Sequence, residues 1–367
     1  MRGRVLVATV ALVVAILGTS LAPAADEPSD TQSSQSPAAP DSRPGRDVRE
    51  SKAIITLQIE NDFFSRWAKS DRDYTNGFRI GWLSTPTPIP EWLVGVSTLP
   101  SFIDRRKADT VVRRWGISLG QNLYTPEDTS VRNLIPTDRP YAAWLYLGFT
   151  LQYTHAVGDQ PVRLDTLELD LGVIGPAAGG RFVQNNFHTL IGGDKARGWH
   201  NQLRNEPTVN LTFERRWRVG RLDLSLPLGL ESDVIPRMGL AVGNVATYAS
   251  FGGILRIGND LRNDFGPPRA RPAMPGSETF TTRDSFAWYF FVGFDGQAHA
   301  RNIFLDGNTF RHSHHVDRNP FVLDVQAGVA FLFRNARISL THVLRSPEFA
   351  ERHRWQQFGS VSVAFRY

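Results

Sequence analysis

Hydrophobic and polar residues alternate along most of the chain from residue 53 to the C-terminus. Between Leu222 and Leu230, for example, a leucine occupies every second position. This two-residue period is typical of a β-strand, because successive side chains point to opposite faces of the sheet. Similar runs recur near residues 53–60, 77–84, 113–122, 142–155, 163–174, 207–218, 221–236, 245–258, 284–299, 320–333, 335–345 and 355–367.

The length of these runs predicts strands that cross a membrane. A tilted transmembrane strand needs about 9–11 residues, and bacterial outer-membrane barrels close with an even number of antiparallel strands. The last run ends on an aromatic residue, Tyr367, as such barrels commonly do. We therefore predict an all-β protein, an antiparallel transmembrane β-barrel of about twelve strands. The expected aromatic girdles comprise Trp82, Trp115, Trp144, Trp217 and Trp288. A soluble β-sandwich or lipocalin-like barrel in the periplasm is the alternative.

The N-terminal region does not share this pattern. Arg2 and Arg4 precede an apolar stretch at 5–17, and a small-residue cleavage signature follows at 22–24. These features predict a secretory signal peptide over residues 1–25, with an uncleaved anchor as the alternative. Residues 26–51 are rich in Pro, Ser and acidic residues and predict a disordered leader. The barrel is expected to occupy residues 52–367.

Composition narrows the class of protein. The chain has no cysteine, so an exported fold must be stabilised without disulfides, as a closed barrel is. The formal net charge is only +5, and arginines are scattered through the strand-like runs. This distribution does not indicate nucleic-acid binding, but it is compatible with an anionic membrane surface. We expect outer-membrane lipid as a partner and a monomeric chain.

One segment departs from the strand period. Between residues 181 and 191, the apolar residues Val183, Phe187, Leu190 and Ile191 recur at helical spacing, and glycine pairs flank the segment. We predict a short helix in a long loop. His188 lies beside its apolar stripe, and Gln184 lies one turn earlier. A single histidine at a helix edge is more often structural than catalytic.

Polar clusters at strand ends supply candidate ligands for a hard cation, which prefers oxygen donors. Glu60, Asn61 and Asp62 form one cluster, and a second runs from Asp71 to Thr75. Ordinary turn chemistry explains the same residues equally well. A histidine-rich run at 311–318 lacks the spacing of a zinc site, and we interpret it as a polar loop.

Five motifs resemble, in order, the outer-membrane lipid A 3′-O-deacylases of the LpxR-like family: ENDFF…DRDYTNGFRIGW, GQNLYTPED, DRPYAAWLY, GVIGPAAGGRFVQNNFHTLIGG and GWHNQLRNEP. The resemblance covers about residues 53–367. It implies a twelve-stranded barrel with a calcium-dependent esterase site between the outer wall and a short helix of an extracellular loop. It also implies release of the 3′-linked acyloxyacyl chain of lipid A.

The resemblance assigns roles to particular residues. It implies that His188 is the general base and that Asn61, Asp62 and Thr75 surround Ca²⁺. An acidic residue, usually glutamate, corresponds to Asp194. The arginine of a Lys-Arg pair corresponds to Arg132. Val131 replaces the lysine, and Arg113 or Lys195 are candidates to supply the missing cation. Arg72, Arg132 and Arg139 are candidates to meet lipid phosphates or to be ordinary interface charges.

The sequence therefore supports a lipid A deacylase, with two alternatives. The first is a non-enzymatic outer-membrane barrel, an adhesin or a pore, whose active site has decayed, which the missing lysine favours. The second is a periplasmic binding barrel. No nucleophilic serine elbow is present, so the expected chemistry is direct attack by water.

Overall fold

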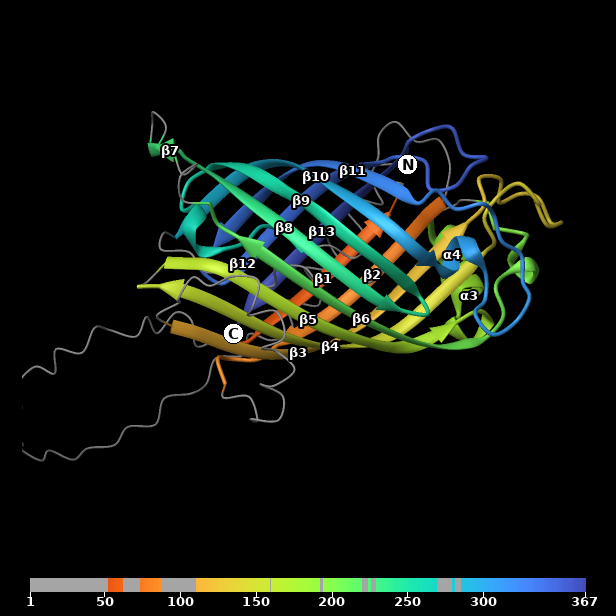
Figure 1. The fold of residues 1–367 in the computed structure, drawn as a ribbon, viewed down its shortest axis with the longest axis horizontal. Coiled ribbons are helices and arrows are strands. Elements are labelled where there is room, and N and C mark those ends of the chain that lie inside the picture. Colours follow the sequence, from red (N-terminus) through yellow and green to blue (C-terminus); the bar gives the residue numbers. More distant parts are fainter. Residues whose placement is uncertain are drawn as a thin grey trace, which may run out of the picture.

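The alternating runs form the strands of one antiparallel sheet (Figure 1). The computed structural model describes residues 52–61, 73–87, 110–158, 160–191, 194–219, 224–225, 229–268, 279–280 and 285–367. The predicted signal peptide and leader lie outside these residues. The strands are β1 (Ile54–Asn61), β2 (Asp73–Leu83), β3 (Thr110–Thr125), β4 (Ala142–Val157), β5 (Gln160–Ile174), β6 (Glu206–Trp217), β7 (Leu224–Ser225), β8 (Glu231–Gly243), β9 (Ala246–Gly258), β10 (Phe286–Asn302), β11 (Phe321–Phe333), β12 (Ala336–Arg345) and β13 (Gln356–Arg366).

Hydrogen bonding closes the sheet into a barrel. Each long strand pairs with its sequence neighbours, β1 also pairs with β13, and β6 pairs with β8. The two-residue β7 only extends the end of β8, so twelve strands form the ring. Closure leaves no unpaired edge, which is a requirement for a sheet that crosses lipid. The predicted twelve-stranded barrel is confirmed.

The strand predicted at 221–236 was misplaced. The long strand here is β8, which covers Glu231–Gly243, and most of the leucine run lies outside the described residues. Gly229 has a φ of 71°, which turns the chain before β8 begins. In β8, the residues that point into the barrel include the charged Asp233 and Arg237. A polar inner face is typical of a membrane barrel.

The two faces of the wall differ as a membrane barrel requires. The outward residues Ile117, Leu147 and Phe149 are more than 40% exposed, although each is large and apolar. Inward residues are polar and paired: Arg79 bonds Glu168 at 2.9 Å, and Arg345 bonds Asp324 at 3.0 Å. A soluble lipocalin-like barrel would have the opposite polarity, with an apolar interior.

The predicted aromatic girdle is present at the end of the barrel that carries the C-terminus. Trp82 and Trp115 pack edge to face with ring centroids 4.9 Å apart, and the Trp82 indole donates to the Tyr367 hydroxyl at 2.9 Å. The assignment of Trp144 to a girdle was wrong. Trp144 points into the barrel, is fully buried, and donates to the Thr208 hydroxyl because an enclosed indole N–H needs an acceptor.

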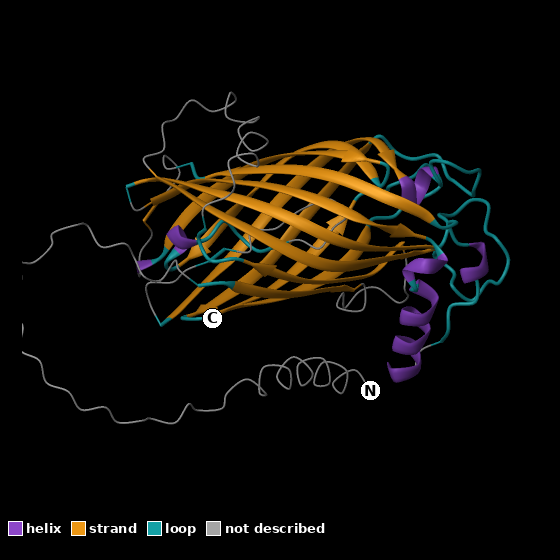
Figure 2. Cartoon of the chain, turned by 90° about the horizontal axis from the view of Figure 1, so that it is seen from below, coloured by secondary structure: helices purple, strands orange, loops and turns teal. Residues whose placement is uncertain are grey.

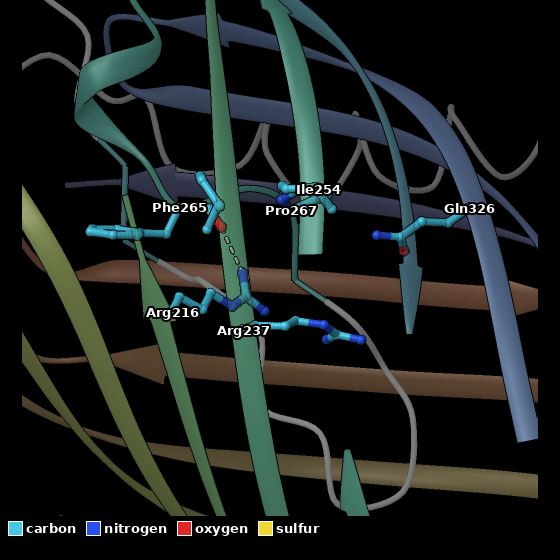
Figure 3. Close-up of a pocket in the computed structure, with 7 residues that line it drawn as sticks. Arg216, Arg237, Ile254, Phe265, Pro267 and Gln326 are labelled. Atoms are coloured by element: carbon cyan, nitrogen blue, oxygen red, sulfur yellow. Dashed lines mark hydrogen bonds between the residues drawn. The ribbon is translucent and has the colours of Figure 1, made fainter. Parts of the chain in front are cut away.

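Side chains and a folded-back segment fill the barrel interior. After β9, residues 259–268 enter the lumen, where Asp264 bonds Arg256, Arg337 and the Tyr289 hydroxyl. Arg216 donates to the Phe265 carbonyl at 2.8 Å, and Gln58 donates to the Pro268 carbonyl at 3.3 Å. Figure 3 shows Arg216, Phe265 and Pro267 around a small interior cavity of about 10 Å³, large enough for about one water molecule.

The opposite end carries the long loops and helices α3 (Gly180–Ile191) and α4 (Ile303–Asp306) (Figure 2). Loops from different hairpins are tied together there: Arg352 pairs with Glu127, and the His314 ring lies 2.7 Å from the Asp138 carbonyl. None of the described helices combines the length and hydropathy needed to span a bilayer. The predicted helix at 181–191 is confirmed as α3.

Candidate functional site

Helix α3 begins on the outer wall of the barrel. A 3-10 turn at Pro176–Ala178 and Gly179, with a φ of 72°, redirect the chain after β5. The outward-facing Gln121 side chain of β3 donates to the Ala178 carbonyl at 2.6 Å. A Cβ on Gly180 would lie only 2.5 Å from the Ala143 Cβ of β4. The start of the helix therefore contacts the wall too closely for any larger residue.

An apolar bed fixes the helix and its returning loop on this wall. Its buried members are Leu123, Tyr141, Ala143, Ala178, Ala196 and Trp199, with Leu145, Val173 and Val183 packed against them. Strands, helix and loop all contribute, so the bed joins segments far apart in the sequence. Of the predicted apolar stripe, Val183 packs here, whereas the side chains of Leu190 and Ile191 lie outside the described part of the structure.

His188 is buried on α3, with 7% of its surface exposed. Its Nδ1 lies against the backbone carbonyl of Asp194, which can only accept a hydrogen bond. Nδ1 is therefore a protonated nitrogen, and in the neutral form of the ring the lone pair lies on Nε2. The expected acidic partner, Asp194, reaches the histidine through its main chain, so the length of its side chain does not enter this contact.

Gln184 precedes His188 by one helical turn, so the two side chains share a face of α3. The Trp199 indole donates to Gln184 Oε1 at 2.7 Å, which orients the amide. The amide nitrogen is buried and has no hydrogen-bond partner among the described residues. The four-residue spacing from His188 signalled this residue in the sequence, but the contact with Trp199 was not predictable.

The first hairpin brings two of the three predicted calcium ligands to the outer wall. Asn61, at the end of β1, is outward and buried, and it pairs in register with Asn76, which pairs with Leu123 of the apolar bed. The register shifts between Tyr74 and Asn76, and the Thr75 hydroxyl lies 2.8 Å from the Thr125 hydroxyl. Asp62 lies outside the described residues. Thr125, the hydrogen-bond partner of Thr75, was not singled out from the sequence.

The loop after β3 lies beside the loop that follows α3. The Arg197 amide donates to the Thr129 carbonyl at 2.9 Å, and the Asn201 side chain donates to the Arg132 carbonyl at 2.8 Å. This pairing places the segment 195–201 alongside Val131. Arg132, Lys195 and Arg197 are all exposed. Lys195 remains a candidate to replace the family's lysine at Val131, and Arg197 is a second candidate because it lies on the same segment.

Two predicted cations are elsewhere. Arg113 lies near the start of β3, paired in register with Tyr153 toward the opposite end of the barrel, so its assignment as the substitute cation was wrong. Arg139 is buried and bonds Glu348 at 2.6 Å, so neither of its two expected roles, binding lipid phosphate or ordinary interface charge, fits. Burial alone would raise the pKa of Glu348, but the guanidinium groups of Arg345 and Arg139 outweigh it and lower the pKa to about 2.

The histidine-rich run forms no metal cluster. The His314 ring contacts the Asp138 carbonyl, and His315 lies 3.3 Å from the Ser313 carbonyl. Across the described ranges, no group of three or more His, Cys, Asp or Glu side chains is arranged to hold a metal ion. A set built mainly from amide and hydroxyl oxygens, as expected for the first hairpin, is a different type of site.

Comparison with known proteins fits this geometry. The family model described as Outer membrane protein LpxR matches residues 10–367. The chain belongs to the LpxR family. It is accordingly a protein of the bacterial outer membrane.

A solved structure titled "LpxR from Salmonella typhimurium" is similar to this LpxR-family barrel, with a TM-score of 0.66 and 20% sequence identity. The match covers 85% of this chain and 99% of that one, and at this identity it shows the shared fold. The beta domain of the Bordetella autotransporter BrkA also matches, with a TM-score of 0.38, 11% identity, and 86% and 97% coverage. No curated protein matches the chain.

Proposed function

We propose that this protein is a calcium-dependent esterase that removes the 3′-linked acyloxyacyl chain from lipid A. Membership of the LpxR family supports an outer-membrane protein that modifies lipid A. The observation that carries the finer proposal is His188: a buried imidazole, oriented by a backbone carbonyl, on the helix that packs against the outer wall. A position on the outer wall suits a substrate whose acyl chains remain in the membrane.

His188 acts as the general base. With Nδ1–H directed at the Asp194 carbonyl, Nε2 accepts a proton from the attacking water. Proton transfer by a positioned side chain typically contributes about 10²–10⁴-fold to a rate. The Asp194 carbonyl then stabilises the imidazolium that forms and keeps its ring in place. Because water is the nucleophile, this scheme requires no serine.

The amide nitrogen of Gln184 is proposed as a donor to the reacting ester. Trp199 holds the amide oxygen, so the N–H groups have a fixed direction before substrate binds. A preorganised donor stabilises developing negative charge better than a mobile one, because it does not need to reorient. Gln184 and His188 thus serve the two ends of the reaction, the developing oxyanion and the attacking water.

The candidate calcium ligands are Asn61, Asp62 and Thr75. The outward amide of Asn61 and the hydroxyls of Thr75 and Thr125 are oxygen donors of the type that Ca²⁺ prefers, so the described part of the set fits. When bound, Ca²⁺ polarises the acyl carbonyl and stabilises the oxyanion. The exposed Arg132, Lys195 and Arg197 are suited to bind the phosphate groups of lipid A.

A non-enzymatic barrel is the second candidate. Its pore version is disfavoured, because paired side chains and the segment 259–268 occupy the lumen. Its adhesin version is favoured by Val131, which stands where the family carries a lysine. The two remaining functions differ in their effect on lipid A, because the esterase removes an acyloxyacyl chain and the adhesin leaves the lipid unchanged.

The test is mass spectrometry of lipid A after incubation with the purified full-length protein, with Ca²⁺ or with a chelator. We expect loss of the acyloxyacyl chain with Ca²⁺, and no loss with the chelator or with His188→Ala. Asn186→Ala, an exposed position on the same helix, is the matched control and should retain activity. Unchanged lipid A in the presence of folded wild-type protein would contradict the esterase proposal and favour an adhesin. Full activity in His188→Ala would show that His188 is not the general base.

A further inference from the structure

A second feature of the outer wall lies across β9, β10 and β11, nearly opposite the wall covered by α3 in the strand order. It is a groove of about 450 Å³. Its outward-facing lining residues are Ala249, Phe251, Gly296, Ala298, Phe321 and Leu323. Phe321 is the first residue of β11, so along the barrel axis the groove lies toward the end that carries α3.

The strand register builds the groove from a small-residue floor and tall sides. Gly296 pairs with Phe251 and Leu323, and Ala298 pairs with Ala249 and Phe321. Ala249, Gly296 and Ala298 therefore lie side by side and leave a trough. Phe251 and Phe321 form its sides and are 62% and 75% exposed.

Gly296 is not required by packing or by the backbone. A Cβ on Gly296 would meet only the Phe251 carbonyl oxygen, at 3.7 Å, and its φ is not positive. On the same strand, a Cβ on Gly293 would lie 2.5 Å from the Gly253 carbonyl. Neither a clash of the Cβ nor a positive φ therefore requires glycine at position 296, and the absence of a side chain leaves the groove open.

We propose that this groove binds one acyl chain of a lipid A molecule, at a site separate from the α3 site. The wall lies in the outer membrane, so the apolar groups that contact it are lipid acyl chains. An apolar trough left empty would forfeit the contacts of its lining atoms, and a linear chain restores them. Ser346 lines the groove, and its hydroxyl oxygen accepts a hydrogen bond from the Leu323 amide. The polar end of the groove is therefore at the end of β12, near the loops. The choice of lipid A over phospholipid rests on the proposed function, which places the α3 end in the lipid A leaflet.

The test uses the full chain in a bacterial outer membrane, with His188→Ala present so that bound lipid A is not consumed. The photo-crosslinker p-benzoylphenylalanine replaces Phe321 in the groove or, as the control, Ala327, an exposed outward position farther along β11. Gly296→Leu should fill the trough, and its Cβ has room on the backbone. We expect it to abolish most crosslinking of lipid A at position 321 and to leave the yield at position 327 unchanged.

Three results would overturn the proposal: a yield at position 321 that Gly296→Leu does not change, a crosslinked phospholipid in place of lipid A, or a crosslink to a second copy of the chain. Binding is measured in an inactive variant, so the two proposals fail separately. If the wild type leaves lipid A intact but crosslinking depends on Gly296, only the esterase proposal is lost. Heat-modifiable migration in gels checks that each variant has folded.

Discussion

Polar groups are buried both in the barrel lumen and under α3, but they are arranged differently. In the lumen, charges face countercharges: Asp264 meets Arg256 and Arg337, and Glu348 meets Arg139 and Arg345. Under α3, the groups are an imidazole held by a main-chain carbonyl and an amide with a nitrogen that lacks a partner among the described residues. The paired charges join interior segments of the barrel, whereas the proposed function assigns the imidazole and the amide under α3 to the substrate.

This comparison predicts that lumen substitutions change stability and α3 substitutions change activity. Asp264→Ala should have the largest effect, because it leaves two buried arginines without their shared carboxylate. Removing one partner of a buried ion pair typically costs about 3–5 kcal/mol. Urea unfolding in detergent measures the loss, and the folded fraction should keep its activity. Asp317→Ala, at an exposed position, is the control. A stable Asp264→Ala barrel would contradict the role of the lumen network.

Acid should weaken the second group of buried ion pairs, in which Glu348 meets Arg139 and Arg345. Its pKa falls from 4.5 to about 2 on folding, so its contribution to stability is complete above pH 4.5 and is lost as the pH falls toward 2. That contribution is on the order of 3 kcal/mol. The free energy of unfolding at about pH 5 and about pH 3 should differ less in Glu348→Gln than in the wild type. An identical pH dependence in both proteins would show that other carboxyls dominate acid unfolding.

Gly180→Val should affect activity and spare the barrel. The new side chain collides with Ala143 and Trp199 and must shift the start of α3 away from the wall. A displacement of about 1 Å in a catalytic group can cost roughly 100-fold in rate. The rate of lipid A turnover should therefore fall, while the free energy of unfolding measured in urea stays unchanged. Parallel loss of both would mean that α3 also stabilises the barrel.

Trp199→Phe should have the smallest effect, because it removes only the hydrogen bond that orients Gln184 and keeps an aromatic ring in the apolar bed. A hydrogen bond of this kind is worth about 0.5–1.5 kcal/mol, so turnover should fall roughly two- to tenfold. Gln184→Ala in the Trp199→Phe background should then cost less than Gln184→Ala alone. Additive effects would show that Trp199 does not act through Gln184.

The sequence predicted most of the barrel and missed particular positions for physical reasons. Alternation located eleven of the twelve long strands to within a few residues, because a membrane wall imposes the same apolar face on every strand. It failed at β8, where the leucine run precedes the strand. It also failed at Trp144, because an aromatic residue near a strand end looks the same whether it faces lipid or the lumen.

The candidate site was predictable only as separate pieces. The motifs singled out His188, Asn61 and Thr75, but the contact between His188 and the Asp194 carbonyl depends on how the loop returns from α3. Arg139 and Arg113 appeared suitable as lipid-binding cations until the fold buried one and moved the other to the far end. Nothing in their local sequence carries that information.

By itself, the sequence determined the strand period, the polarity of the two faces and the helical spacing of α3, because these depend on residues a few positions apart. Only the tertiary structure decided which charges are neutralised in the lumen, which polar groups meet on the outer wall, and where small residues from three strands combine into a groove. Those outcomes depend on barrel closure and strand register, which bring together side chains separated by up to hundreds of residues.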